Sequence, residues 1–333
     1  MHESVSYYVQ GNMKRLVASI IIIMVVFFPN MVLAETEPAS DTLPVVKRWE
    51  IKSSAAFNIN QLHFSNWAEG GESSMSGVMW FNFSATHKKA RYSATHQLIM
   101  GYGLLTNRDR DLRKTEDRLE YTGSYSYQAY KKWNYMTQIN FRTQFSNGYR
   151  YPNDSVIIST FMAPAYLTLS LGMQYKPSDN FSLFFSPASG KFTIVSNQEL
   201  ADKGSFGVSP AIYVNDSLVA HGSQIKPEFG FNLNANLKKE IFTNVNLESR
   251  LLLHNNYLDS DPGNRWNFDV NWDALLNFTV NKTMSTTLRM NLIYDHNVKI
   301  NEYKIIDGQK VLSGSGPRTQ FKESFGIGIN YKF

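Results

Sequence analysis

The last thirteen residues, from Phe321 to Phe333, read FKESFGIGINYKF. Apolar or aromatic side chains alternate with polar side chains or glycine, which gives the segment one apolar face and one polar face. The alternation runs to the final residue, which is aromatic, although chain ends usually fray. This pattern predicts an amphipathic strand that closes a bacterial outer-membrane β-barrel.

The other end of the chain has the features of a secretory leader. Met13-Lys14-Arg15 precede an apolar run from Leu16 to Phe28, and Val32-Leu33-Ala34 supplies a cleavage site. The apolar run is shorter than the roughly 20 residues that a transmembrane helix needs. We therefore expect residues 1–34 to be an upstream extension plus a signal peptide that is cleaved after Ala34.

The remaining chain divides into a short lead-in and one large domain. Residues 35–48 are rich in proline, serine, threonine and acidic residues, which predicts a flexible segment. We expect residues 49–333 to form a single domain.

Composition narrows the functional classes. The chain has no cysteine, which excludes disulfides and thiolate-ligated metals. Its net charge of +5 is too small to indicate a nucleic-acid partner. The 18 tyrosines and 22 phenylalanines suggest aromatic girdles at a membrane surface as well as a core.

Twelve amphipathic stretches follow one another along the domain. They are residues 49–61, 75–87, 91–103, 117–130, 133–146, 160–175, 180–195, 226–238, 243–257, 265–280, 283–297 and 318–333. Each exceeds the roughly 9–11 residues with which a tilted strand crosses a bilayer. The predicted fold is all-β, a transmembrane antiparallel up-and-down barrel of about 12 strands.

The connections between these stretches alternate in length. Five are short and each contains lysine, whereas six are longer: 62–74, 104–116, 147–159, 196–225, 258–264 and 298–317. Short periplasmic turns that alternate with long external loops are typical of outer-membrane barrels. The turn lysines are either ordinary solvated residues or contacts to anionic lipid head groups.

The polar face of the stretches predicts the lining of the barrel. If the apolar face contacts lipid, eleven charged residues line the lumen: Arg118, Glu120, Arg142, Glu228, Glu248, Arg250, Asp269, Asp273, Arg289, Asp295 and Lys322. Two interpretations remain open, because such charges can form a structural ion-pair network or a hydrated path that selects small charged solutes.

The longer loops contain further candidates. Ser196-Asn197-Gln198-Glu199 fits a capping box, which predicts a short helix over residues 200–203 with Gly204 as its stop. This helix could constrict the barrel mouth or pack on its surface. Trp67, Tyr149 and Tyr151 lie among carboxylates and turn residues, as in loops that bind glycans.

The sequence gives only weak signals for a metal-binding or catalytic site. The seven histidines lack metal-ligand spacing, so we expect no metal, cofactor or catalytic site. His221 lies near Ser223, but the sequence offers no evident third residue to orient the base.

Six short motifs stand out along the chain: Ser65-Asn66-Trp67-Ala68-Glu69-Gly70-Gly71-Glu72, Tyr151-Pro152-Asn153-Asp154-Ser155, Ala163-Pro164-Ala165-Tyr166-Leu167, Ser186-Pro187-Ala188-Ser189-Gly190-Lys191, Leu200-Ala201-Asp202-Lys203-Gly204 and Gly316-Pro317-Arg318. Together they resemble domain-of-unknown-function family 3078, which comprises secreted proteins of Bacteroidetes-type bacteria. The resemblance implies an outer-membrane β protein and brings no activity with it.

We therefore expect an outer-membrane, porin-like channel for small polar or charged solutes. The alternative is a plugged barrel whose loops bind glycan, lipopolysaccharide or a protein, with an outer-membrane hydrolase as a distant third. The expected partners are outer-membrane lipid and the barrel-assembly machinery, for which the terminal Phe333 would be the signal.

Overall fold

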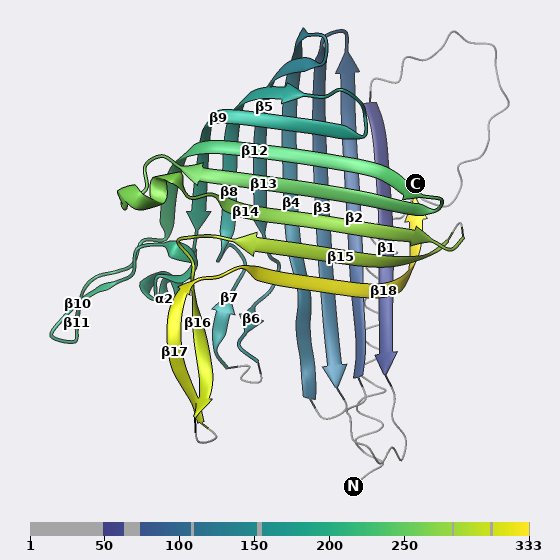
Figure 1. Ribbon diagram of the computed structural model, residues 1–333. Helices are drawn as coiled ribbons and strands as arrows, with labels where there is room; N and C mark the ends of the chain where they lie inside the picture. Colours follow the sequence, from purple (N-terminus) through teal and green to yellow (C-terminus); the bar gives the residue numbers. More distant parts are fainter. Residues whose placement is uncertain are drawn as a thin grey trace, which may run out of the picture. The chain divides into compact units, whose positions relative to one another are not determined.

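A computed structural model of the protein describes residues 49–62, 74–107, 110–151, 155–281, 283–306 and 309–332. Within the compact unit Lys47–Phe333, twelve antiparallel strands form one closed barrel (Figure 1). The strands are β1 (Trp49–Leu62), β2 (Ser74–Lys89), β3 (Tyr92–Asn107), β4 (Arg110–Tyr130), β5 (Trp133–Thr143), β8 (Ala165–Tyr175), β9 (Phe181–Ile194), β12 (Ile225–Phe242), β13 (Val245–Asn256), β14 (Asp269–Thr279), β15 (Met284–Tyr294) and β18 (Gln320–Lys332). The predicted all-β barrel of twelve strands is confirmed.

Each barrel strand pairs with the barrel strands next to it in sequence, and β1 pairs with β18 to close the ring. The pairing at this seam is short. Residues 54–59 of β1 face residues 327–332 of β18 over six positions, whereas β1 and β2 pair over fourteen. Among the described residues, the seam therefore has the fewest paired positions of any two neighbouring barrel strands.

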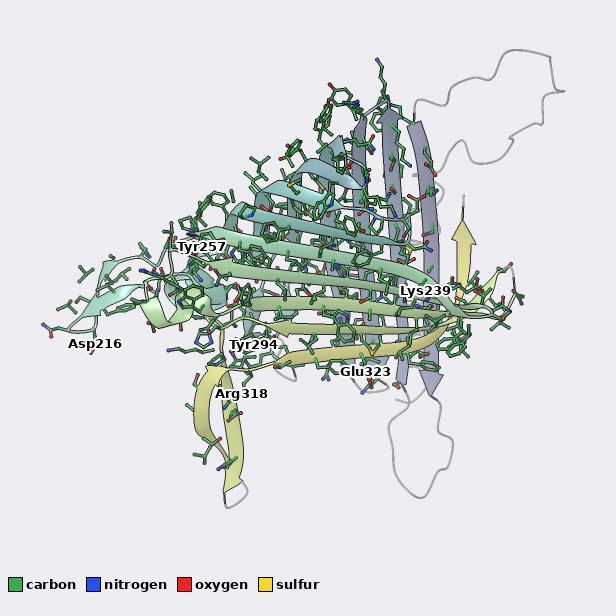
Figure 2. All side chains as sticks on the ribbon, turned by 45° about the horizontal axis from the view of Figure 1, so that its top comes forward. Asp216, Lys239, Tyr257, Tyr294, Arg318 and Glu323 are labelled. Atoms are coloured by element: carbon green, nitrogen blue, oxygen red, sulfur yellow. The ribbon has the colours of Figure 1, made fainter. Side chains whose placement is uncertain are left out.

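The two ends of the barrel differ, as the alternation of connections predicts. Short turns join β2 to β3, β4 to β5, β8 to β9, β12 to β13 and β14 to β15. We call this the turn end, and the opposite end, with the longer connections, the loop end. Figure 2 shows Lys239 at the turn end and Tyr257, Asp216 and Arg318 at the loop end.

The outer face of the barrel is rich in exposed apolar side chains. In β18, Phe325, Ile327 and Ile329 are exposed, whereas the intervening Gly326 and Gly328 are buried. The predicted terminal strand is thus confirmed over residues 320–332, and Phe333 lies outside the described residues. In the part of the chain that the structure describes, no helix is long and apolar enough to cross a membrane.

One predicted loop is wrong. Residues 104–116 were expected to connect two strands, but most of them extend β3 and β4 as a protruding hairpin. Leu104 pairs with Lys114 and Leu105 with Arg113, next to an irregularity after Gly103. The many charges of this segment made it resemble a solvated loop, whereas backbone pairing in a hairpin does not require apolar side chains.

The loop end carries several small elements. They are β6 (Gly148–Tyr149) with β7 (Ile157–Ser159), α2 (Gln198–Asp202), η1 (Ser205–Gly207), β10 (Ile212–Val214) with β11 (Ser217–Ala220), η2 (Pro262–Trp266), and β16 (Lys299–Ile306) with β17 (Gln309–Pro317). The segments 147–159, 196–225 and 298–317 therefore contain regular structure of their own, and they bring residues of the loop end close to the mouth of the barrel.

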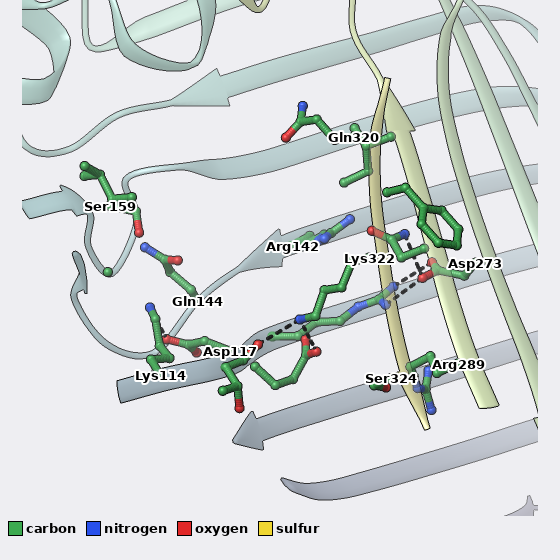
Figure 3. A pocket seen from close by; sticks show the side chains of 18 of the residues that line it. Lys114, Asp117, Arg142, Gln144, Ser159, Asp273, Arg289, Gln320, Lys322 and Ser324 are labelled. Carbon is green, nitrogen blue, oxygen red and sulfur yellow. Dashed lines mark hydrogen bonds and ion pairs between the residues drawn. The ribbon is translucent and has the colours of Figure 1, made fainter. Parts of the chain in front are cut away.

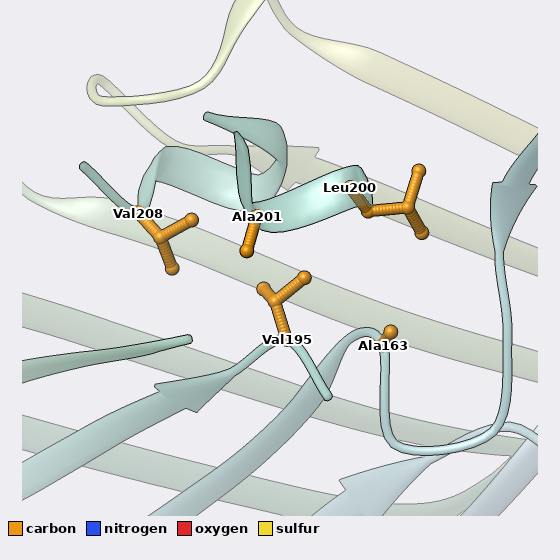
Figure 4. Close-up of a cluster of buried hydrophobic side chains, with 5 residues drawn as sticks. All are labelled: Ala163, Val195, Leu200, Ala201 and Val208. Carbon is orange, nitrogen blue, oxygen red and sulfur yellow. The ribbon is translucent and has the colours of Figure 1, made fainter. Parts of the chain in front are cut away.

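The expected helix exists, but its cap differs from the prediction. Asn197, rather than Ser196, is the N-cap, and its Oδ1 accepts a hydrogen bond from the backbone N–H of Leu200 at 3.0 Å. Gly204 follows with φ of 67°, as expected of a helix stop. Ala163, Val195, Leu200, Ala201 and Val208 form a buried apolar cluster that fixes α2 against the barrel rim (Figure 4).

Candidate functional site

Buried ion pairs cross the lumen near the middle of β4. Arg118 donates through Nη1 and Nη2 to both oxygens of Asp273, at 3.1 Å each. The same guanidinium also donates to Glu120, whose other oxygen accepts from Arg250. Arg118 and Glu120 are buried, with 7% and 2% of their surface exposed. We call these four residues the cross-lumen network.

The network joins opposite walls of the barrel. In the closed strand order β14 is fourth and β4 is tenth, so Arg118 and Asp273 lie six strands apart in either direction around the ring. Because a bidentate arginine–carboxylate pair is both directional and charge-assisted, it restrains the two walls at this level. The lumen is therefore bridged from side to side by protein groups.

A cavity of about 490 Å³ lies beside the network, toward the loop end (Figure 3). Its walls come from β2, β4, β5, β14, β15, β18 and the β6–β7 hairpin. Eight charged residues line it: Lys114, Glu116, Asp117, Arg118, Arg142, Asp273, Arg289 and Lys322. We call it the upper cavity.

Each carboxylate of the upper cavity is paired with a cation. Asp117 binds Lys114 at 2.8 Å and also accepts hydrogen bonds from the backbone N–H groups of Phe145 and Ser146. Glu116 pairs with Lys322, and Asp273 pairs with Arg118. In Figure 3, dashed lines end on Lys322 and on Asp273.

Two guanidinium groups that line the upper cavity have no carboxylate partner among the described residues. Among the residues that the structure describes, no carboxylate lies within 4.0 Å of the guanidinium of Arg142 or Arg289. The lining contains five cationic and three anionic side chains, a difference of two, and this excess falls on those two arginines.

One of these two guanidinium groups, that of Arg289, packs against the ring of Trp80. The Cζ atom of Arg289 lies 3.9 Å from the centre of the Trp80 ring, a cation–π contact. Trp80 is buried, and its ring lies over Gly101 of the neighbouring strand, where an added Cβ would come within 2.5 Å of it. The ring fits in the lumen only because position 101 has no side chain.

A second cavity, of about 310 Å³, shares Asp117, Arg142, Gln144 and Ile293 with the first. Its lining includes Lys191, Asp269, Asp295 and His254. Lys191 binds Asp269 at 2.8 Å and Glu228 at 3.2 Å, and Lys226 also binds Glu228.

Two buried side chains of this second cavity carry polar atoms without a partner. Neither ring nitrogen of His254 nor Oδ1 of Asn232 has a hydrogen-bond partner among the described residues. The two residues are cross-strand neighbours on β12 and β13. Buried polar groups of this kind are normally satisfied by solvent or solute, so the second cavity is a polar compartment.

The other predicted lumen and loop residues lie in different places. Glu248 is near the turn end, where it pairs with Lys238 at 2.9 Å and is half exposed. Tyr149 and Tyr151 line the upper cavity. The backbone N–H of Lys114 donates to the Tyr151 hydroxyl, and the Arg113 guanidinium lies 5.0 Å from the Tyr151 ring. Trp67 lies outside the described residues.

Sequence reasoning missed Trp80, Lys114, Lys191 and Asn291 as parts of this site. Asn291 donates to Asp273 at 3.0 Å and so supports the cross-lumen network. The signal for Trp80 was present in its strand, since it shares the inward parity of Asn82 and Ser84. An aromatic residue on a polar face is the exception that could have drawn attention to it.

His221 does have an acidic partner that the sequence did not reveal. Its Nδ1 lies 3.0 Å from Oδ2 of Asp202. Ser223, however, donates its hydroxyl to the carbonyl of Ile225 at 2.6 Å. The serine hydroxyl is therefore bonded to the nearby backbone, and it does not form a nucleophile–base pair with His221.

A family model described as "Protein of unknown function (DUF3078)" matches residues 59–149. The predicted resemblance is confirmed over this stretch. The bacterial group of the source stays a prediction. No protein of curated function matches the chain.

The chain is also similar, at low identity, to solved structures that include outer-membrane proteins. An outer-membrane channel from Pseudomonas putida F1 is 13% identical, with a TM-score of 0.37, over 90% of this chain and 99% of that one. The NanC porin is 7% identical, with a TM-score of 0.34, over 85% and 100% of the two chains. The translocator domain of the autotransporter NalP from Neisseria meningitidis is 10% identical, with a TM-score of 0.29, over 99% and 98%.

Proposed function

We propose that this protein is an outer-membrane channel for small charged or polar solutes, held closed at rest by the cross-lumen network. The exposed apolar outer face of the strands and the leader-like N-terminus support a position in the outer membrane. The polar inner face and the two charged cavities support solute passage rather than a solid core.

The observation that carries the proposal is the bond between opposite walls, from Arg118 to Asp273. A solute that crosses this level must displace the bond or pass beside it. Removing one partner of a buried ion pair typically costs about 3–5 kcal/mol, because the other charge is left uncompensated. Separating Arg118 from Asp273 without a replacement partner would likewise leave the charge of Asp273 uncompensated, so the network favours the closed state.

Planar bilayers test this function. Wild-type protein should give small, infrequent conductance steps, and Asp273→Asn should open more often because Arg118 loses one of its two acidic partners. Glu302→Gln is the matched control, since Glu302 also pairs with an arginine, Arg318, but in the exposed β16–β17 hairpin. Exposed pairs contribute little, so this control should behave as wild type.

Silence of both the wild type and Asp273→Asn at every voltage would contradict the proposal. That result would favour a plugged barrel that acts through its loops.

A further inference from the structure

We propose that the upper cavity binds a small organic carboxylate, held by Arg142 and Arg289. This inference rests on the proposed function and deepens it, because it names the class of solute that the channel would accept. It starts from the charge balance of the cavity, in which every lining carboxylate already has a cation and these two guanidinium groups have none.

The other cations near the upper cavity all have carboxylate partners, so the surplus positive charge belongs to Arg142 and Arg289. Lys114 is held by Asp117, Lys322 by Glu116, and Arg118 by Asp273 together with Glu120. Arg250, the remaining cation of the network, pairs with Glu120. Since those cations are paired within 4.0 Å, an incoming anion gains most by approaching Arg142 or Arg289, which have no carboxylate within that distance among the described residues.

The setting of Arg289 suits a ligand. The contact with the Trp80 ring supports the guanidinium, and no hydrogen bond from its N–H groups to another described residue is formed. A guanidinium that is positioned in advance loses less entropy when it binds a carboxylate through two parallel hydrogen bonds.

Arg142 lies at the boundary between the two cavities. It lines both cavities, so its side chain lies where the upper cavity meets the polar compartment of His254 and Asn232. An anion bound at Arg142 would therefore lie next to the second cavity. Passage between sites of moderate strength is what conduction requires, because a single tight site would retain the solute.

The rest of the lining favours an organic anion over an inorganic one. Trp80, Ile158 and Ile293 contribute apolar surface beside the two arginines, and Tyr149 and Tyr151 add aromatic rings. Binding sites that combine an apolar wall with a few placed polar groups are typical of small-molecule recognition. A volume of about 490 Å³ accommodates an aromatic or short aliphatic acid.

Isothermal titration of the folded full-length barrel in detergent, at low salt, tests the site without any conductance measurement. The probes are benzoate, its neutral counterpart benzamide, and inorganic phosphate. Benzoate should bind at least tenfold more tightly than the other two. Arg142→Gln and Arg289→Gln should each weaken benzoate binding at least tenfold, and Arg142→Lys should weaken it less.

Arg91→Gln is the matched control, because Arg91 is exposed in the short turn between β2 and β3. It should leave benzoate binding unchanged. Heat-modifiable migration on gels checks that each variant is folded. Equal binding of benzoate and benzamide, or benzoate binding that both Arg→Gln variants retain, would overturn the inference.

The two proposals fail separately. Arginine-dependent binding with silent bilayers would preserve the site and reject the channel. Conductance without arginine-dependent binding would preserve the channel and reject the site.

Discussion

At the scale of single residues, one glycine decides whether the lumen can contain a tryptophan. A Cβ on Gly101 would approach the Trp80 ring to 2.5 Å, whereas a Cβ on Gly77 would meet Phe57 at 3.5 Å, an ordinary contact. Gly101→Ala should therefore displace the ring or strain the wall, at a cost of about 1–3 kcal/mol. Gly77→Ala should cost much less.

Urea unfolding of the two variants in detergent measures the difference. Gly101→Ala should also weaken benzoate binding, since it moves the seat of Arg289. Equal midpoints for both variants would show that Trp80 is free to move away without penalty.

At the scale of elements, the segment 196–225 is fixed by a carboxylate. Asp202 accepts hydrogen bonds from the Gln198 side chain at 2.8 Å and from the backbone N–H of Gly222 at 2.7 Å, and it faces His221. These contacts lower the pKa of Asp202 below its ordinary value of 3.8, with the bond from Gln198 contributing most. The charged form is thus favoured in the folded loop.

The sign of the pH dependence follows from this lowered pKa. The stabilisation is present above pH 3.8 and is lost as the pH falls from there through the lower pKa of the folded loop. We expect hydrogen exchange of residues 196–225, corrected for intrinsic rates, to increase between pH 6 and pH 3 more than that of β13. Asp202→Asn should reduce this difference, and an unchanged difference in the variant would contradict the role of Asp202.

The strands and the charged site were predictable to different degrees. Period-2 alternation placed all twelve strands, because successive side chains of a strand point to opposite faces. The same parity placed residues such as Arg118 and Asp273 on one face. It could not pair them, because contact between residues 155 positions apart depends on closure of the ring and on the shear of the barrel. Local periodicity contains neither.

At the scale of the whole molecule, the membrane interpretation makes a prediction that a water-soluble barrel does not. Leu171 on β8 and Val219 on the β10–β11 hairpin are equally exposed, at 63% and 64%. In a bilayer, Leu171→Arg should cost about 2–4 kcal/mol, as at the midplane of other barrels. Val219→Arg lies on a hairpin outside the barrel wall and should be tolerated.

Folding yield and urea stability in lipid vesicles distinguish the cases. If both substitutions are equally tolerated, the outer face does not contact lipid.

The cross-lumen network has a further consequence for the order of events in folding. Arg118 and Asp273 belong to the N-terminal and C-terminal halves of the barrel, and the pair can form only when the curved sheet has brought these distant strands face to face. Contacts between residues so far apart in sequence form late and slow the reaction. The seam between β1 and β18 is short, with six paired positions. Once formed, the cross-lumen network would hold the two halves of the barrel together and oppose their separation along that seam.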